Sequence, residues 1–345
     1  MEMGVIMVFK KNLFFSSFFT ILMAFCGCSV SSADQAWHTV FDAYPQKSII
    51  KTLRYNPQIT KYEPLYDTVT HESESRVTVY CHGYGESQAS IPYLQKMGIL
   101  SGTIIGFNFE SAVEQGMPPL GKTSLGQTKD IASLCLVLKC IHESGVNIID
   151  LSGFSAGAAT IANTLARLAQ PSYYPKFFKK LNITNAEATS ILNKCLKGIV
   201  TLLCPLIDAR IITVSKTFGF LMNWTISLAG GSYNPKGDQA IKAAPVLEAL
   251  NPNIIIAFQK NDPVLGNEKD IPFCQKISGK NTYIIMGETP GSHTIDYKMA
   301  HTIQAHRKKC GAPYNATDEV LEAGAAILTK AQPATHALAD YMKIC

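Results

Sequence analysis

Three residues whose side chains can act together in nucleophilic catalysis stand far apart in the chain: Ser155, Asp262 and His293. A serine hydroxyl is a weak nucleophile at its own pKa, and it needs an adjacent base such as the His293 imidazole. A carboxylate such as that of Asp262 can then hold the imidazole in one tautomer and stabilise its protonated form. These residue types predict acyl transfer through a serine, on condition that the fold brings them together.

Ser155 has the most informative surroundings. It stands in Gly153-Phe154-Ser155-Ala156-Gly157, which follows an apolar run at 148–151 and precedes small, helix-compatible residues. A strand, a sharp turn and a helix with the serine at the tip form a nucleophile elbow. The elbow brings strand and helix so close that side chains at the two glycine positions would collide. An ordinary strand-to-helix turn can share this pattern, so the other elements must support it.

Strand-like and helix-like patterns alternate over most of the chain. Predicted strands cover 77–81, 102–109, 148–151, 198–206, 253–258 and 281–286, and predicted helices cover 91–97, 129–143, 156–168 and 297–308. This alternation predicts the α/β class, with a mostly parallel central sheet and helices on both faces. Ligands of such sheets bind outside the carboxyl ends of the strands. Ser155, Asp262 and His293 each follow a predicted strand and are therefore expected at that edge.

Four segments resemble the α/β-hydrolases, in the family's order, over residues 76–306. They are His82-Gly83-Tyr84-Gly85, the elbow at 153–157, and the loops that carry Asp262 and His293. The resemblance implies the α/β-hydrolase fold, with eight mostly parallel strands. It also implies acyl transfer on ester, thioester, amide or peptide bonds. The substrate does not follow from it, because one fold hosts many functions.

The resemblance also implies a role for each matching residue. Ser155 is expected to be the nucleophile, His293 the base and Asp262 the acid that orients the base. The oxyanion hole is expected to consist of two backbone N–H groups, those of Tyr84 and of Ala156, the residue after the nucleophile. The histidine that precedes Gly83 is structural in the family and supports the oxyanion loop.

Other acids and histidines compete for these roles. Asp208 also follows a predicted strand and is the alternative acid, although a nearby arginine gives it a simple ion-pair partner. Asp262 is preferred, because it lies on a short, stiff loop one helix and one strand before the histidine. Asp150 lies inside a core strand and faces the wrong way for a relay. His301 and His306 lie in a predicted helix and are expected to be solvated.

Two insertions interrupt the α/β rhythm, around 171–197 and 209–249. The centre of the second, at 218–224, is apolar and aromatic. A transmembrane span is the alternative, but polar residues keep its apolar length well short of the ~20 residues that a span requires. The pattern therefore predicts an inserted cap over a pocket, within a hydrolase domain that covers 34–345.

Residues 1–33 have the features of an export signal. Two lysines precede an apolar segment at 13–27 that is too short to span a bilayer comfortably. Cleavage after Ala33 fits the small residues there, whereas a loose lipobox would instead leave a lipidated Cys28. An uncleaved membrane anchor is a third alternative. The protein is therefore expected to be exported, as a secreted, periplasmic or lipid-anchored protein, and to associate with membrane only through an N-terminal lipid or an uncleaved signal.

Composition excludes several classes. The net charge of +5 is spread along the chain without a long basic block, so nucleic acid is not an expected partner. No dinucleotide fingerprint and no metal-ligand spacing appears in the sequence, so neither cofactor nor metal is expected. An even number of cysteines follows Cys28, which permits disulfides in an exported chain. Cys81 and Cys135, however, lie in core-like segments and are expected to be buried thiols.

Taken together, the motifs predict a serine hydrolase, most simply a carboxylic ester hydrolase or lipase-like enzyme that acts on a small-molecule ester or acyl substrate. Two alternatives stay open. A serine peptidase of the same fold would need a group that holds a peptide terminus, and the sequence identifies none. A non-catalytic surface or binding relative would be expected to have lost at least one of the motifs.

Overall fold

The computed structural model describes residues 59–64, 68–69, 76–83, 86–109, 128–206, 240–260, 262, 281–287 and 293–315. All of them belong to the part of the chain from residue 35 onward. The predicted export signal at 1–33, Tyr84, Asp208 and most of the second insertion lie outside the described residues. Within the described ranges, no helix combines the length and the apolar character needed to cross a membrane.

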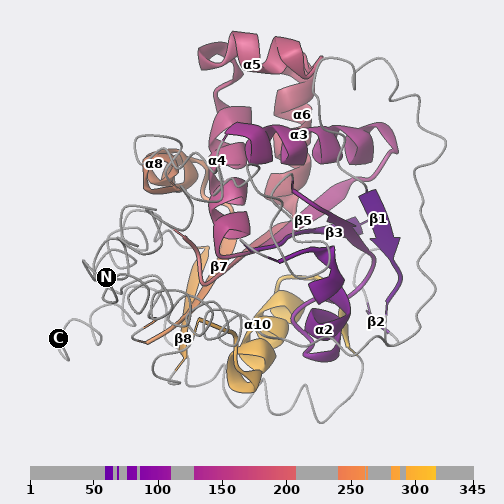
Figure 1. Cartoon of the computed structure of the whole chain (residues 1–345), viewed down its shortest axis with the longest axis vertical. Coiled ribbons are helices and arrows are strands. Elements are labelled where there is room, and N and C mark those ends of the chain that lie inside the picture. Colours follow the sequence, from indigo (N-terminus) through magenta and orange to yellow (C-terminus); the bar gives the residue numbers. More distant parts are fainter. Residues whose placement is uncertain are drawn as a thin grey trace, which may run out of the picture. The chain divides into compact units, whose positions relative to one another are not determined.

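Seven of the described strands form one sheet, in the order β1-β4-β3-β5-β6-β7-β8 (Figure 1). They are β1 (Ile59–Tyr62), β3 (Arg76–Cys81), β4 (Ile104–Phe107), β5 (Ile148–Phe154), β6 (Ile199–Leu203), β7 (Asn253–Gln259) and β8 (Thr282–Gly287). β1 pairs with β4 in antiparallel orientation, and the other neighbours pair in parallel. A separate antiparallel pair joins β2 (Thr68–Val69) to β9 (Tyr314–Asn315). The predicted mostly parallel sheet is confirmed.

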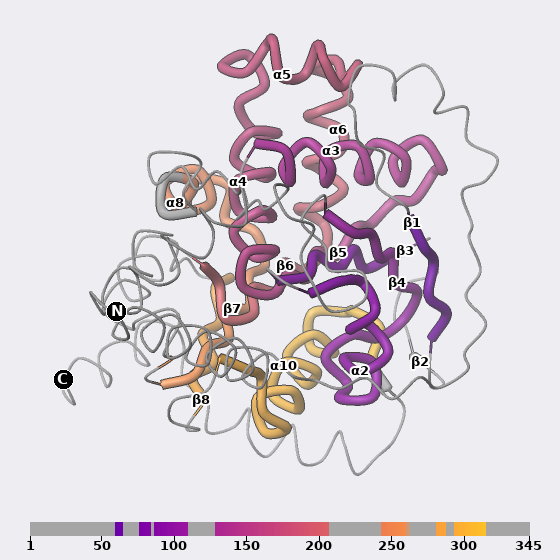
Figure 2. The backbone as a smooth tube through the Cα atoms, in the orientation of Figure 1, coloured from indigo at the N-terminus to yellow at the C-terminus, as the bar shows by residue number. Residues whose placement is uncertain are grey.

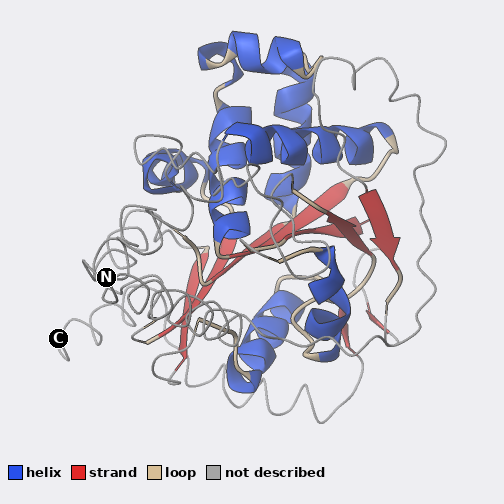
Figure 3. Cartoon of the chain, viewed as in Figure 1, coloured by secondary structure: helices blue, strands red, loops and turns tan. Residues whose placement is uncertain are grey.

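Helices cover both faces of the sheet, as Figure 3 shows. One face carries α3 (Thr128–Glu143), α4 (Ala156–Ala169), α6 (Asn185–Lys197) and α8 (Ala240–Leu250), and the opposite face carries α2 (Ile91–Lys96) and α10 (Tyr297–Lys309) (Figures 1 and 2). A parallel sheet requires this arrangement, because each crossover returns the chain over a face of the sheet. With the serine-bearing turn between β5 and α4, the chain has the α/β-hydrolase fold.

The first predicted insertion, at 171–197, contains three helical segments: η3 (Pro171–Tyr173), α5 (Pro175–Lys180) and α6. A capping box starts α6: the Thr184 hydroxyl accepts the Glu187 N–H at 3.2 Å, and the Glu187 carboxylate accepts the Thr184 N–H at 2.7 Å. α6 contacts β5, α3 and α4, so it belongs to the helical layer on that face. α8, at the end of the second insertion, also contacts α4.

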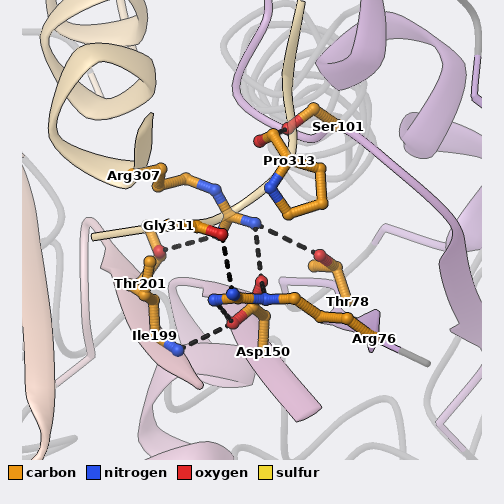
Figure 4. A network of polar contacts seen from close by, with 9 residues as sticks. All are labelled: Arg76, Thr78, Ser101, Asp150, Ile199, Thr201, Arg307, Gly311 and Pro313. Atoms are coloured by element: carbon orange, nitrogen blue, oxygen red, sulfur yellow. Dashed lines mark hydrogen bonds and ion pairs between the residues drawn. The ribbon is translucent and has the colours of Figure 1, made fainter. Parts of the chain in front are cut away.

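A buried network of charged groups ties the strands to α10 (Figure 4). Both carboxylate oxygens of Asp150 accept bonds from the Arg76 guanidinium, at 2.9 and 3.1 Å. Arg307, from α10, donates to the same carboxylate at 3.2 Å, and the Ile199 N–H donates to it at 2.7 Å. Asp150 is fully buried. The prediction that Asp150 takes no part in a catalytic relay is consistent with these structural bonds, which join β3, β5, β6 and α10.

Two sequence-based expectations about α10 are wrong. His301 and His306 were expected to be solvated, yet His301 is buried and His306 stacks on Tyr283 of β8 with 4.0 Å between ring centroids. Burial lowers the pKa of His306 to about 4. The physical reason is that α10 packs against β8, and a helical pattern alone does not say which polar side chains lie on the packed face.

The expectation for the two core-like cysteines is confirmed, since Cys81 and Cys135 are both fully buried free thiols. Burial raises the pKa of the Cys135 thiol to about 12. Both thiols therefore stay protonated and behave as small apolar side chains.

Candidate active site

Ser155 stands alone between the end of β5 and the start of α4, in a strained backbone conformation. Its φ is +50° and its ψ is −113°, a combination that non-glycine residues rarely adopt. Two hydrogen bonds, one to the last residue of β6 and one to the segment just after it, hold it there. The Ser155 N–H donates to the Leu203 carbonyl at 2.8 Å, and the Ser155 carbonyl accepts the Leu206 N–H at 3.0 Å. Strain of this kind costs on the order of 1–3 kcal/mol and occurs most often at functional sites.

The two glycines of the elbow are required by close backbone approach. A Cβ at Gly153 would lie 2.8 Å from the Ala158 nitrogen, and a Cβ at Gly157 would lie 2.1 Å from the Cys81 carbonyl oxygen. Both separations are shorter than real Cβ contacts, so the predicted collisions are found at both positions. The Gly157 contact also places the first turn of α4 directly against the end of β3, where the His82-Gly83 segment begins.

His293 and Asp262 lie together at the carboxyl edge of the sheet. The His293 Nδ1 is 2.7 Å from the Asp262 Oδ2. Asp262 comes just after β7 and His293 just after β8, and these strands pair in parallel as far as Gln259 and Gly287. The Asp262 side chain is fully buried, whereas 17% of the His293 side chain is exposed. A buried carboxylate that faces Nδ1 is suited to fix the orientation of the imidazole, so that Nε2 of the ring points away from the carboxylate.

The elbow and the histidine loop meet around the end of β6. The Phe154 ring, next to Ser155 in the chain, lies 5.1 Å from the His293 ring, measured between centroids. Cys204, the residue after β6, donates its Sγ–H to the Thr294 carbonyl at 3.8 Å. Its neighbour Leu203 accepts the Ser155 N–H. The three predicted catalytic residues therefore gather at the ends of β5, β7 and β8, on either side of β6.

Of the two predicted oxyanion donors, Ala156 is within the described residues and Tyr84 is not. Ala156 is the first residue of α4 and is 5% exposed. The N–H groups of a helix's first turn have no carbonyl partner inside the helix, and they carry the positive end of its dipole. This N–H is therefore suited to stabilise negative charge that develops beside Ser155.

His82 is a buried structural residue next to the predicted oxyanion loop. Its Nε2 accepts the Phe109 N–H at 3.0 Å, so its Nδ1 carries the proton and donates to the Gly83 carbonyl at 2.8 Å. Burial lowers the pKa of His82 to about 4, which keeps the ring neutral. These bonds agree with the supporting role that the sequence predicts for this histidine.

Glu86 was not singled out from the sequence, although it lies close to the predicted site. Its Oε2 accepts the Gly83 N–H at 3.1 Å, and its own N–H donates to the Gly83 carbonyl at 3.2 Å. Burial raises the pKa of Glu86, an effect that the Gly83 N–H and the nearby His293 oppose. A charged residue directly after the His82-Gly83-Tyr84-Gly85 motif was the available signal.

Comparisons with known proteins give structural likenesses only. No family model matches the chain, and no curated protein sequence matches it. A carboxylesterase from Lactobacillus plantarum is 13% identical over 87% of this chain and 95% of its own, with a TM-score of 0.49. An inhibited esterase B from Lactobacillus rhamnosis is 14% identical over 97% of both chains, with a TM-score of 0.49. A monoacylglycerol lipase from Paleococcus ferrophilus is 13% identical over 74% of this chain and 98% of its own, with a TM-score of 0.45.

Proposed function

We propose that this protein is a serine hydrolase that cleaves carboxylic esters of small molecules. The observation that carries the proposal is the strained Ser155 elbow at the same sheet edge as the 2.7 Å pair of His293 and Asp262. A strained turn alone fits many strand-to-helix junctions, and a histidine–aspartate pair alone fits many structural ion pairs. Their convergence at the carboxyl edge of a parallel sheet is what acyl transfer through a serine requires.

In the proposed reaction, the Ser155 Oγ attacks the ester carbonyl carbon and passes its proton to the His293 Nε2. The carbonyl oxygen becomes an oxyanion, which the N–H groups of Ala156 and Tyr84 stabilise. The intermediate collapses, the alcohol leaves with the proton from Nε2, and the acyl group stays on Ser155. A water molecule then gives a proton to Nε2 and attacks the acyl carbon. The acid departs, and Oγ recovers its proton.

Asp262 takes part in this cycle without changing its own protonation state. With Nδ1–H donating to the buried Asp262 carboxylate, the lone pair of the neutral imidazole lies on Nε2, where it can accept the serine proton. The charge of Asp262 then stabilises the imidazolium that forms. Because the Asp262 side chain is fully buried, this stabilisation acts with little screening by water.

The function is tested with a panel of p-nitrophenyl esters from acetate to octanoate, beside p-nitroanilides of single amino acids as peptidase substrates. The proposal expects ester hydrolysis by the wild-type protein, and little hydrolysis of the anilides. Faster turnover of the anilides would make the protein a peptidase of the same fold. Absence of turnover on every substrate, together with no labelling of Ser155 by a fluorophosphonate, would make it a non-catalytic relative.

A further inference from the structure

Three side chains with metal-ligand atoms converge beside the proposed active site, from the ends of three adjacent strands. They are Cys204 after β6, Asp262 after β7 and His293 after β8, and their ligand atoms all lie within 4.8 Å of one another. The cysteine takes no part in the proposed reaction. Among the described residues, this group has the donor types that a transition metal selects.

A thiolate, an imidazole and a carboxylate suit zinc, which binds such ligands in tetrahedral geometry with about 2.3 Å to sulfur and about 2.0 Å to nitrogen or oxygen. Ligand atoms around one ion would then lie about 3.3–3.7 Å apart. The His293 Nδ1 and Asp262 Oδ2, now 2.7 Å apart, would have to separate by about 0.6 Å. The Cys204 Sγ, at no more than 4.8 Å, would have to approach by about 1 Å or less.

The charges of this group also suit a divalent cation. A thiolate and a carboxylate together carry two negative charges, which neutralise Zn²⁺ and so reduce the cost of burying it. Cys204 and Asp262 are buried, and the partly exposed His293 side chain offers the route from solvent. Binding releases one proton to water, from the Cys204 thiol. The neutral imidazole keeps its single proton, which moves from Nδ1 to Nε2 when the metal binds Nδ1.

The backbone already directs Cys204 toward the histidine loop. Its φ is +42°, an uncommon value for a residue with a side chain. Its N–H donates to the Ala257 carbonyl at 2.6 Å, and its Sγ–H donates to the carbonyl of Thr294, the residue after His293. These bonds fix the thiol near His293 before any ligand arrives.

We propose that Cys204, Asp262 and His293 form an inhibitory zinc site. Zn²⁺ bound to these three side chains, with water as the fourth ligand, holds the imidazole and occupies the carboxylate that would otherwise orient it. The imidazole then no longer accepts the proton of Ser155, and acyl transfer stops. The inhibition rests on the proposed function, whereas the metal site itself does not depend on it.

Metal binding is measured first, on the Ser155→Ala variant, so that the result does not depend on activity. Calorimetric titration with ZnCl₂ is expected to show one site, and titration with CdCl₂ is expected to produce the ultraviolet charge-transfer band of a cadmium thiolate. A second substitution, Cys204→Ala, in the Ser155→Ala variant should weaken zinc binding at least about tenfold and abolish the cadmium band. The reason is that even the loss of a residue that hydrogen-bonds to a metal ligand costs about 10–100-fold in metal affinity. Adding Cys204→Ser tests the same point with a side chain closer in size.

A matched control exists in Cys310, whose Sγ lies 3.7 Å from the His306 Nε2 and forms another thiol–imidazole pair. Cys310→Ala, in the same Ser155→Ala background, should bind zinc and cadmium as its parent does. The proposal is overturned if the cadmium band is absent from the parent protein. It is also overturned if the Cys204→Ala and Cys204→Ser variants keep the band, whatever the Cys310→Ala variant does.

Inhibition is then measured on the active protein by ester hydrolysis at increasing ZnCl₂, followed by EDTA. Zinc should inhibit the wild type reversibly, and Cys204→Ala should keep its basal turnover but need at least about tenfold more zinc for half-inhibition. Equal sensitivity of the two proteins would refute an inhibitory role for this site. If the wild type hydrolyses no ester, the proposed function fails, while the binding titrations still decide whether the zinc site exists.

Discussion

Replacing Asp262 by asparagine should abolish most turnover and leave the fold intact. The amide has nearly the same shape as the carboxylate and still reaches the His293 Nδ1, which now lies 2.7 Å from Oδ2. An amide N–H₂ that faces Nδ1 favours the tautomer with the proton on Nε2. The imidazole then has no lone pair at Nε2 for the serine proton, and the imidazolium loses its buried counter-charge.

The expected loss in kcat is up to about 10⁴-fold, which corresponds to about 5.5 kcal/mol of transition-state stabilisation at about 1.36 kcal/mol per factor of ten. KM should change little, because the Asp262 side chain is fully buried and cannot contact the substrate. The loss should therefore appear in kcat, and the melting temperature should stay close to that of the wild type.

The assay is steady-state hydrolysis of p-nitrophenyl butyrate, with thermal melts of each variant in parallel. Asp208→Asn is the matched control, because Asp208 is the alternative acid that the sequence offers. It should lower kcat far less than Asp262→Asn does. A greater loss in Asp208→Asn, or a loss below about tenfold in a well-folded Asp262→Asn, would show that Asp262 does not orient the imidazole.

Three further predictions concern the elbow, the buried network and acid stability. Gly157→Ala should reduce kcat/KM by about 10²-fold, because the alanine Cβ would lie 2.1 Å from the Cys81 carbonyl oxygen and must displace the elbow. A variant with the kcat/KM of the wild type would contradict this. Asp150→Ala should lower the free energy of unfolding in urea by about 3–5 kcal/mol, since the substitution leaves buried guanidinium groups without their carboxylate. An unchanged midpoint of urea unfolding would contradict this prediction. Burial lowers the pKa of His82 from 6.5 to about 4, so the unfolded chain binds more protons than the folded protein below pH 6.5. The melting temperature should therefore fall as the pH is lowered from about 6.5 to 4, and a melting temperature that stays constant over this range would argue against a buried neutral ring.

The strands β3 to β8 and the helices α2, α3, α4 and α10 could be predicted because their patterns are local. The run 148–151 and the glycines around Ser155 predict a strand, a turn and a helix, and the structure has β5 and α4 there. The segment 297–308 likewise predicts α10. The pattern did not show that His301 and His306 face the protein interior, because that depends on how α10 packs against β8, and β8 is a separate segment of the chain.

Contacts between distant segments could not be read from the sequence. Arg307 and Asp150 are 157 positions apart, and nothing in either segment names the other as its partner. Cys204 and Thr294 are 90 positions apart, so the convergence of a thiol with the Asp262–His293 pair depends on the order of β6, β7 and β8 in the sheet. Asp262 and His293 were assigned because both follow predicted strands, and the carboxyl ends of parallel strands share one edge.

The most direct test of the central claim is the labelling of Ser155 by a fluorophosphonate, with the modified residue located by mass spectrometry. An activated serine at the elbow should react until one equivalent is bound, the label should map to Ser155, and hydrolysis should disappear in proportion. Ser155→Ala should remain folded and unlabelled, with kcat lower by about 10³-fold or more. A label on any other residue of the active protein, or an alanine variant that keeps more than about a tenth of wild-type turnover, would contradict the account.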